Sequence, residues 1–274
     1  MLVLFYRVLL FFGIFFLCLA VLMNFLSLTS KQNKINNILP LPTEISEIYD
    51  KNFETLIDLD DLKRFVGEEV KKKNYQGIEI AIYIDDVIRK KYFHQIAYIS
   101  NETNWLLKVA DYFFPKFEFL SAMDPKELAK KNHAICNQQA IVFQEIVKDY
   151  SLEYASIGFE IKTPDGNNLG HFASAVKVKN DWFYFDSNLE PKYNRRDPSI
   201  FTRVLEADKD TLKQLYPSDD FSLVTKNMIN FRDLNSFPAK RGVMFQKMTS
   251  FFSNFFWIFL TLMALMLRKY LAKN

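Results

Sequence analysis

The sequence is poor in the residues that build disulfide frameworks and zinc sites. Its 274 residues include two cysteines, Cys18 and Cys136, and three histidines. Cys18 lies inside an apolar run, so no disulfide framework is available to the fold. A zinc site needs three or four ligands at spacings such as CxxC or HExxH, which are absent here. The carboxylates from Asp58 to Asp61 lack the pattern of a calcium loop. We therefore expect no metal and no other cofactor.

An excess of charge is also lacking. Lysine and arginine total 35 and aspartate and glutamate total 32, which leaves a formal net charge of +3. No stripe of basic residues alternates with aromatic ones. The sequence therefore predicts no nucleic-acid partner.

Two long runs contain no charged residue, one near each end of the chain. The run from Val8 to Leu28 has 21 residues, which as a helix would span about 30 Å, the thickness of a hydrocarbon core. The run from Met248 to Leu267 precedes a basic tail. A cleaved signal peptide for the first run, or a buried core helix for either, are the alternatives. We predict transmembrane segments at residues 1–29 and 248–274, with the lipid bilayer as a partner.

Two membrane spans place both termini on the same side of the membrane. The final tail carries Arg268, Lys269 and Lys273 and no acidic side chain. The tendency of positive charge to stay inside favours cytoplasmic termini, with the middle of the chain across the membrane. In a bacterium this predicts an inner-membrane protein whose domain lies in the periplasm.

The residues between the spans predict one globular domain. Residues 30–76 are interpreted as a linker and a helical lead-in, and residues 77–247 as the domain with a C-terminal extension. Ile78 to Tyr92 is predicted to be helical, although its opening IEIAIYI also fits a strand. Helical spacing recurs from Trp105 to Phe114, and Asp124 followed by Pro125 indicates the start of a short helix.

Cys136 stands where another helix should begin. The apolar residues from Ala140 to Tyr150 recur at helical spacing, with polar residues between them. A cysteine in the first turn lies beside unpaired backbone N–H groups and the positive end of the helix dipole, which favour the thiolate. The position suits a nucleophile, while a small buried side chain is the alternative.

A hairpin further along supplies a histidine and an aspartate. The segments HFASAVKV, from His171, and WFYFD, which ends at Asp186, are predicted to pair around a Lys179-Asn180 turn. Paired residue numbers then sum to 359, which makes Asp186 the diagonal neighbour of His171. Phe172, Val176, Phe183 and Phe185 share the other face. Ala173 and Ala175, beside His171, are expected to leave room for a helix.

These three residues together offer a thiol mechanism. His171 would take the proton of Cys136, and Asp186 would orient the imidazole. A single histidine or aspartate is more often structural, so the prediction rests on the order and spacing of all three.

The order CNQQA, HFASAVKV and WFYFDSN resembles the Cys, His, Asp core of the transglutaminase-like superfamily, a branch of the papain-like thiol enzymes. The resemblance covers roughly residues 80–191, and its spacing is similar to that of compact microbial members. It implies an α+β fold in which the helix that carries the cysteine packs on an antiparallel sheet. The proline that often follows the family's aspartate is Ser187 here.

The resemblance implies a membrane-anchored cysteine peptidase, amidase or acyltransferase that acts on a peptide or protein near the membrane. Cys136, His171 and Asp186 would be catalytic, and Trp105 would be a candidate donor to the oxyanion. An arylamine-acetyltransferase-like enzyme and a non-catalytic, membrane-tethered interaction module remain as alternatives. Gln138 and Gln139 could line the cleft or face solvent.

Overall fold

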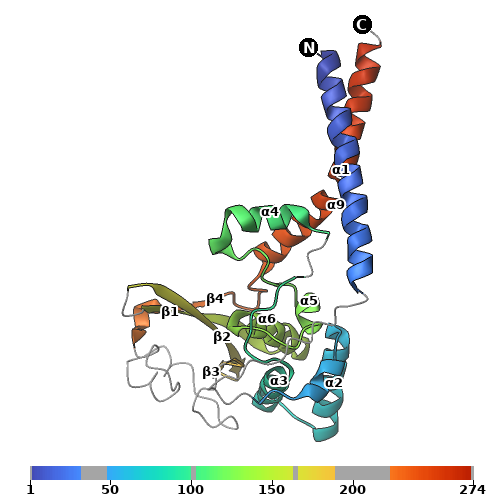
Figure 1. Cartoon of the computed structure of the whole chain (residues 1–274). Coiled ribbons are helices and arrows are strands. Elements are labelled where there is room, and N and C mark those ends of the chain that lie inside the picture. The colour runs from blue at the N-terminus through green and yellow to red at the C-terminus, as the bar shows by residue number, and fades with distance from the viewer. Residues whose placement is uncertain (1, 32–47, 100–102, 163–165, 189–222, 273–274) are drawn as a thin grey trace. The chain divides into compact units, whose positions relative to one another are not determined.

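The computed structural model describes residues 2–31, 48–99, 103–162, 166–188 and 223–272 (Figure 1). The chain divides into two compact units. The first, the span unit, comprises Met1–Asn37, Tyr98–Ser121 and Lys240–Asn274. The second, the sheet unit, comprises Ile38–Ala97 and Ala122–Ala239. The long apolar helices therefore belong to one unit and the candidate catalytic residues to the other.

Two long helices dominate the span unit. Helices α1 (Leu2–Lys31) and α9 (Lys240–Leu271) lie side by side, and both chain ends lie at the same end of the pair (Figure 1). Both are long and apolar enough to cross a membrane, which favours a membrane location. The Asn24 Nδ2 group donates to Asn254 Oδ1 across the pair at 2.8 Å. Apolar helices therefore flank the chain, as predicted.

The span unit also contains a short helix. Helix α4 (Trp105–Phe113) confirms the helical spacing seen in the sequence, and the 3₁₀ turn η2 (Pro115–Phe117) follows it. The Asn104 side chain caps α4 by accepting from the Leu107 N–H at 3.2 Å. This helix packs on α9 within the unit.

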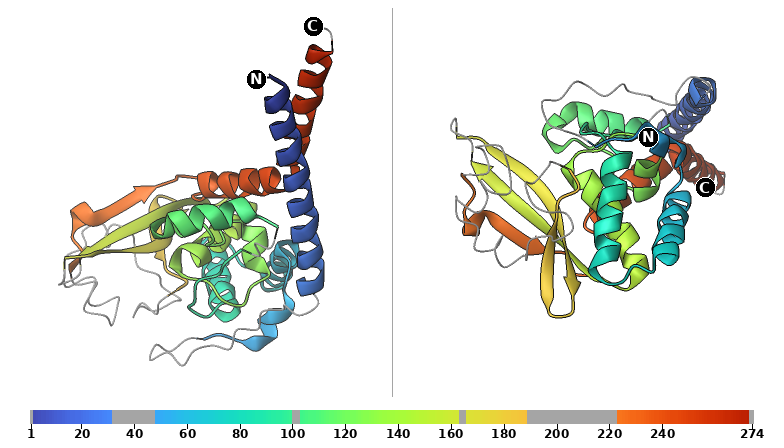
Figure 2. Two further views of the ribbon diagram at one scale, coloured as in Figure 1. Left: turned by 45° about the horizontal axis from the view of Figure 1, so that its top comes forward. Right: turned by 90° about the horizontal axis from the view of Figure 1, so that it is seen from below.

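The sheet unit combines helices with one antiparallel sheet. Its helices are α2 (Leu59–Lys73), α3 (Ile78–Lys91), α5 (Pro125–Ala129) and α6 (Cys136–Val147), with 3₁₀ turns η1 (Lys51–Thr55), η3 (Lys148–Tyr150) and η5 (Lys226–Met228). Its strands are β1 (Glu153–Lys162), β2 (Asn168–Val178), β3 (Asp181–Phe185) and β4 (Ile229–Arg232), in the spatial order β3-β2-β1-β4. Helix α6 packs on β1 and β2, α3 packs on α6, and α2 packs on α3 (Figure 2). The fold is α+β, as predicted.

Local sequence signals explain where these helices begin and end. Asp58 caps α2 and Asp124 caps α5, each accepting a backbone N–H two residues later. Asn74 ends α2 in the left-handed conformation, with φ of 54°. In α3, the buried residues Ala81 and Ile84 lie at helical spacing. The prediction of a helix at residues 78–92 is therefore confirmed, and the alternative of a strand is excluded.

The hairpin of β2 and β3 has the predicted register. Ser174 pairs with Phe185 and Val178 pairs with Asp181, so paired numbers sum to 359. Lys179, the first residue of the two-residue turn, has φ of 59°. Since side chains alternate between the two faces of a strand, His171 lies on the same face as Ala173 and Ala175.

The helix α6 covers the face opposite to the one that we expected. The Gln144 amide donates to the hydroxyl of Ser174 at 2.9 Å, and Phe143 packs against Phe185 with ring centroids 5.3 Å apart. The expectation that a helix packs over Ala173 and Ala175 is therefore wrong. The buried Gln144 side chain needs polar partners, and the hydroxyls of Ser156 and Ser174 provide them only on this face.

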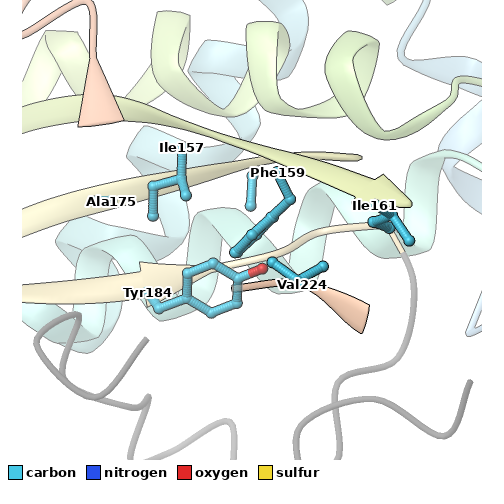
Figure 3. Packing of buried hydrophobic residues seen from close by; sticks show 7 residues of the cluster. Ile157, Phe159, Ile161, Ala175, Tyr184 and Val224 are labelled. Carbon is cyan, nitrogen blue, oxygen red and sulfur yellow. The ribbon is translucent and has the colours of Figure 1, made fainter. Parts of the chain in front are cut away.

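The alanine face instead carries part of the hydrophobic core. Ala173 and Ala175 lie in a buried cluster that is shown in Figure 3 and is completed by Ile157, Phe159, Ile161, Tyr184 and Val224. Small side chains on β2 leave space for the large rings of Phe159 and Tyr184, whose centroids are 6.2 Å apart. The part of this face around Ala173 and Ala175 is therefore filled mainly by side chains of neighbouring strands.

Candidate active site

Cys136 is the first residue of α6, and a buried glutamine fixes this helix start. The Gln138 Oε1 atom accepts from the N–H groups of Ile135 at 3.2 Å and Ala97 at 2.9 Å. Its Nε2 group donates to the carbonyls of Ala97 at 2.7 Å and Ala122 at 3.0 Å. One side chain thus joins three separate segments around the residue before the cysteine. Cys136 itself is half-buried.

The two adjacent glutamines therefore face the protein and not solvent. Gln138 is 0% and Gln139 1% exposed. Gln139 Nε2 donates to the Ala134 carbonyl at 2.8 Å, inside the same turn. The sequence analysis left their positions open, although a glutamine at the third helical position is typical of helix starts in which the side chain binds back to the cap. That signal could have placed Gln138.

His171 and Asp186 come together as the hairpin register predicts. The His171 Nε2 atom lies 2.5 Å from Asp186 Oδ2. His171 is 6% and Asp186 1% exposed. The other carboxylate oxygen, Oδ1, accepts the Asn188 N–H at 3.0 Å. Both oxygens of Asp186 are therefore engaged, and the carboxylate is held in one orientation toward the imidazole.

The second nitrogen of His171 serves Cys136. A hydrogen bond joins the two side chains, and since Nε2 is taken by Asp186, Nδ1 is the ring nitrogen left for the sulfur. Burial acts to lower the pKa of His171. The Asp186 carboxylate, its hydrogen bond and the contact with Cys136 outweigh burial, so the pKa of His171 is raised above its ordinary value. The environment thus stabilises an imidazolium beside the sulfur.

The segment after Asp186 is fixed by side chains of other elements. The Ser187 hydroxyl donates to Asp85 Oδ1 at 2.5 Å, and Asp85 lies on α3. The Asn188 side chain lies 2.6 Å from His94 Nδ1. A small polar cavity lies next to this segment, and Arg89 and Gln139 are among its lining residues. Ser187 therefore takes a structural role at the position where the family often has proline.

Trp105 belongs to the span unit. Its indole N–H donates to the Ser253 carbonyl at 3.1 Å, and its ring stacks on Phe16 with centroids 5.4 Å apart. The N–H considered as an oxyanion donor therefore has an acceptor within its own unit. The structure brings together Cys136, His171 and Asp186, and it gives Trp105 a different set of neighbours.

The described residues contain no cluster of metal ligands. Within residues 2–31, 48–99, 103–162, 166–188 and 223–272, no three His, Cys, Asp or Glu side chains lie close enough to hold an ion. The Nδ1 atom of the nearby His133 lies 2.9 Å from Asn132 Oδ1. Burial and then the charge of Lys131 lower the pKa of His133 to about 4, which leaves its ring neutral near pH 7.

Comparison with known proteins identifies a family. A search of curated proteins gives no match. Residues 60–197 match a family described as the transglutaminase-like domain. The match includes α6, the β2–β3 hairpin and all three residues of the Cys136, His171, Asp186 chain. It covers half of the sequence, and the chain therefore belongs to the transglutaminase-like domain family.

Proposed function

We propose that this protein is a membrane-anchored thiol enzyme that hydrolyses a peptide or amide bond or transfers its acyl group. The observation that supports it is the continuous hydrogen-bonded chain from Cys136 through His171 to Asp186. Burying a carboxylate and an imidazole costs solvation energy. A cysteine that served only for packing would not need these two buried partners, whereas a nucleophile that must lose a proton and later regain it does need them.

The first step is attack on the substrate carbonyl. Nδ1 of His171 accepts the thiol proton, the Cys136 sulfur forms a bond to the carbonyl carbon, and the carbonyl π electrons move onto the oxygen. The backbone N–H of Cys136 lies at the N-terminus of α6, where such groups stabilise a developing oxyanion. Asp186 stabilises the imidazolium that forms and holds its orientation.

The second step releases the amine. The carbon–nitrogen bond breaks, the nitrogen takes the proton from His171, and a thioester remains on Cys136. Water, or a second amine, then attacks the thioester carbon while His171 accepts a proton from it. The carbon–sulfur bond breaks, the acid or the new amide leaves, and the proton on His171 returns to the sulfur to restore the thiol. Hydrolysis is the favoured outcome because water is always present. The indole N–H of Trp105 donates to Ser253. We therefore assign stabilisation of the oxyanion to the backbone N–H of Cys136.

The activation of the thiol is tested by alkylation of the full chain in detergent micelles. Limiting iodoacetamide should label Cys136 several-fold faster in the wild type than in His171→Ala, because only the wild type keeps the imidazole that takes the thiol proton. Cys18, which is exposed on α1, is an internal reference in the same sample. Its labelling rate should be the same in both proteins.

The outcome decides between an enzyme and a binding module. Equal labelling of Cys136 in wild type and His171→Ala would overturn the proposed mechanism and would favour a module that keeps the fold without turnover. Asp186→Asn should fall between the two, since it removes the charge that stabilises the imidazolium but leaves the ring in place.

We also propose that the sheet unit lies outside the cytoplasm of a bacterial cell, with α1 and α9 in the inner membrane. The basic tail that follows the apolar part of α9 supports this orientation. Protease added to intact spheroplasts should then cleave the sheet unit. Cleavage only after lysis would place the unit in the cytoplasm and reverse the orientation.

A further inference from the structure

An exposed group of aromatic side chains lies at the end of α4 and in the turn that follows. Tyr112, Phe113, Phe114 and Phe117, which we call the aromatic ridge, are 81%, 68%, 58% and 66% exposed. Single exposed apolar residues are normal in soluble proteins, whereas four large exposed rings within six residues concentrate apolar surface at one place. A surface of this kind marks a contact with a partner or with a membrane.

The other side of α4 is apolar as well. Leu107 is fully buried, and the helix packs on α9 within the span unit. A helix that is apolar on both sides requires apolar surroundings on both sides. Helix α9 covers one side, and the described residues of the span unit leave the aromatic ridge uncovered. Among the described residues, the aromatic ridge is therefore open to a partner or to lipid outside this unit.

Polar contacts fix the place of α4 along the two long helices. The Asn104 side chain donates to the Gln246 carbonyl at 3.2 Å, and the Ser253 hydroxyl donates to Asn104 Oδ1 at 3.2 Å. The next residue, Asn254, accepts the hydrogen bond from Asn24. These amides and hydroxyls form a polar level that crosses α1, α4 and α9.

This level lies near one end of the apolar length of the helix pair. From Asn254 to Arg268 the helix rises about 21 Å, and from Arg7 to Asn24 about 26 Å. Both lengths are below the thickness of a hydrocarbon core, about 30 Å, so the polar level lies at or just inside one boundary of the bilayer. Polar side chains are costly deeper in the bilayer and are common at its boundary, where tryptophan and tyrosine gather. Trp105 and Trp257 both donate to backbone carbonyls at this level, to Ser253 and Asn254 respectively.

We propose that α4 and η2 form an interfacial helix whose aromatic ridge inserts into the boundary between headgroups and acyl chains. This inference depends on the proposal that α1 and α9 span the membrane. The segment from Asn104 to Ser121 carries two lysines, Lys108 and Lys116, and two acidic residues, Asp111 and Glu118. It has no net charge, so insertion depends on apolar area and not on anionic lipid. Lys108 and Lys116 are exposed and long enough to reach the headgroups.

The test measures the depth of a spin label in the full chain, reconstituted in phosphatidylcholine nanodiscs. Phe113→Cys is made in a background with Cys18→Ser and Cys136→Ala, and collisions with oxygen and with a water-soluble nickel chelate are compared. Oxygen concentrates in the bilayer and the chelate in water. The oxygen-to-nickel collision ratio at Phe113→Cys should be several-fold higher than at Lys72→Cys. The Lys72 side chain is 74% exposed on α2 of the sheet unit.

The native Cys18, labelled in a Cys136→Ala background, separates failure of this inference from failure of the span proposal. A high ratio at Cys18 together with a ratio at Phe113→Cys equal to that of Lys72→Cys would overturn the interfacial helix and leave the spans intact. A low ratio at Cys18 as well would overturn the spans themselves.

Spin–spin broadening at Phe113→Cys that disappears on dilution with unlabelled protein would assign the ridge to a second copy of the chain and reject the lipid contact. Adding anionic phosphatidylglycerol should leave the ratio unchanged, and a strong increase would contradict insertion by apolar area.

Discussion

The two cysteines, one in each unit, show how strongly the surroundings decide what a side chain can do. Cys18 is exposed on α1, in a run without charged residues. Cys136 begins α6 and shares a hydrogen bond with His171, which in turn binds Asp186. The same thiol is a surface group in the span unit and a candidate nucleophile in the sheet unit. The difference lies in the buried polar partners and not in the residue type.

The exposure of apolar residues also differs between the two units. In the sheet unit, Leu62, Val66 and Ile84 are fully buried. In the span unit, Phe11 is 66% and Phe25 62% exposed. Apolar residues leave water in both cases, toward the protein core in one unit and, as we propose, toward lipid in the other.

The comparison of the cysteines is tested most directly by turnover of a panel of peptide amides. Cys136→Ala should abolish turnover with the fold intact. His171→Ala should lower kcat by about a thousand-fold or more, and Asp186→Asn by less, because the ring remains available as a base. Cys18→Ala is the matched control and should leave kcat unchanged. Full activity of Cys136→Ala would mean that the two thiols do not differ in the way proposed.

The sheet unit should be sensitive to the loss of one buried amide. Gln138→Ala removes four hydrogen bonds, to the N–H groups of Ile135 and Ala97 and to the carbonyls of Ala97 and Ala122. The Ala97 carbonyl keeps the Ala122 N–H as a donor at 2.8 Å. We expect a loss of roughly 3 kcal/mol in the free energy of unfolding, measured as a lower thermal midpoint. Gln76→Ala, at an exposed position, should change stability by less than about 0.5 kcal/mol. Similar midpoints for the two variants would show that Gln138 does not hold the helix start.

A glycine-to-alanine pair compares the two units directly. A Cβ on Gly13 of α1 would lie 2.8 Å from Thr261 Oγ1 of α9, so the Thr261 side chain or the helices must shift. A Cβ on Gly67 of α2 would meet only the Tyr150 hydroxyl, at 3.7 Å. Gly67→Ala should stabilise by up to about 1 kcal/mol through helix propensity. Gly13→Ala should destabilise by about 1 kcal/mol, because close packing is lost.

Thermal unfolding of both glycine variants in nanodiscs measures this contrast. The two midpoints should move in opposite directions. A change of the same sign in both would indicate that α1 and α9 do not pack through Gly13.

The smallest expected effect is a dependence on pH in the sheet unit. The folded pKa of His171 is raised, so its contribution to stability is fully present below the unfolded value of about 6.5 and is lost as pH rises toward the folded value. The difference in thermal midpoint between wild type and Asp186→Asn should therefore shrink as pH rises above 6.5.

Two other groups titrate with the opposite sign. Burial lowers the pKa of Lys91 to about 8, so stability gained from its neutral form rises with pH above that value. His133 is neutral in both states above pH 6.5, since its folded pKa is about 4. Because both groups are common to the two proteins, they cancel in the difference. A difference that grows with pH would show that Asp186 does not stabilise a charged His171.

The local and near-local features of the fold could be predicted from the sequence. Asp124 before Pro125 predicted a helix start, and the two-residue turn at Lys179 predicted the whole register that joins His171 to Asp186. Both signals act over a few residues, where propensity and alternation decide the structure. The three residues of the candidate site followed from their order along the chain.

The features that were missed depend on contacts between distant segments. Gln138 binds Ala97 and Ala122, which lie 41 and 16 residues away. Gln144 selects the sheet face that α6 covers through Ser156 and Ser174. The position of Gln138 at the helix start is a local signal for its bond to Ile135, but no period in the sequence indicates the distant partners of either glutamine. The neighbours of Trp105 in α1 and α9 lie still farther away in sequence.

The two-residue turn at Lys179 should not tolerate a change in its length. Insertion or deletion of one codon there would shift the pairing by one residue and move every side chain of β3 to the opposite face. Asp186 would then leave His171, although the altered codon lies at the far end of the hairpin from both. In a library of single-codon insertions, an insertion at the Lys179 turn should therefore abolish activity, although the turn is at the surface and away from the candidate site. Lys179→Gly, which keeps the length and relieves the positive φ, should be tolerated.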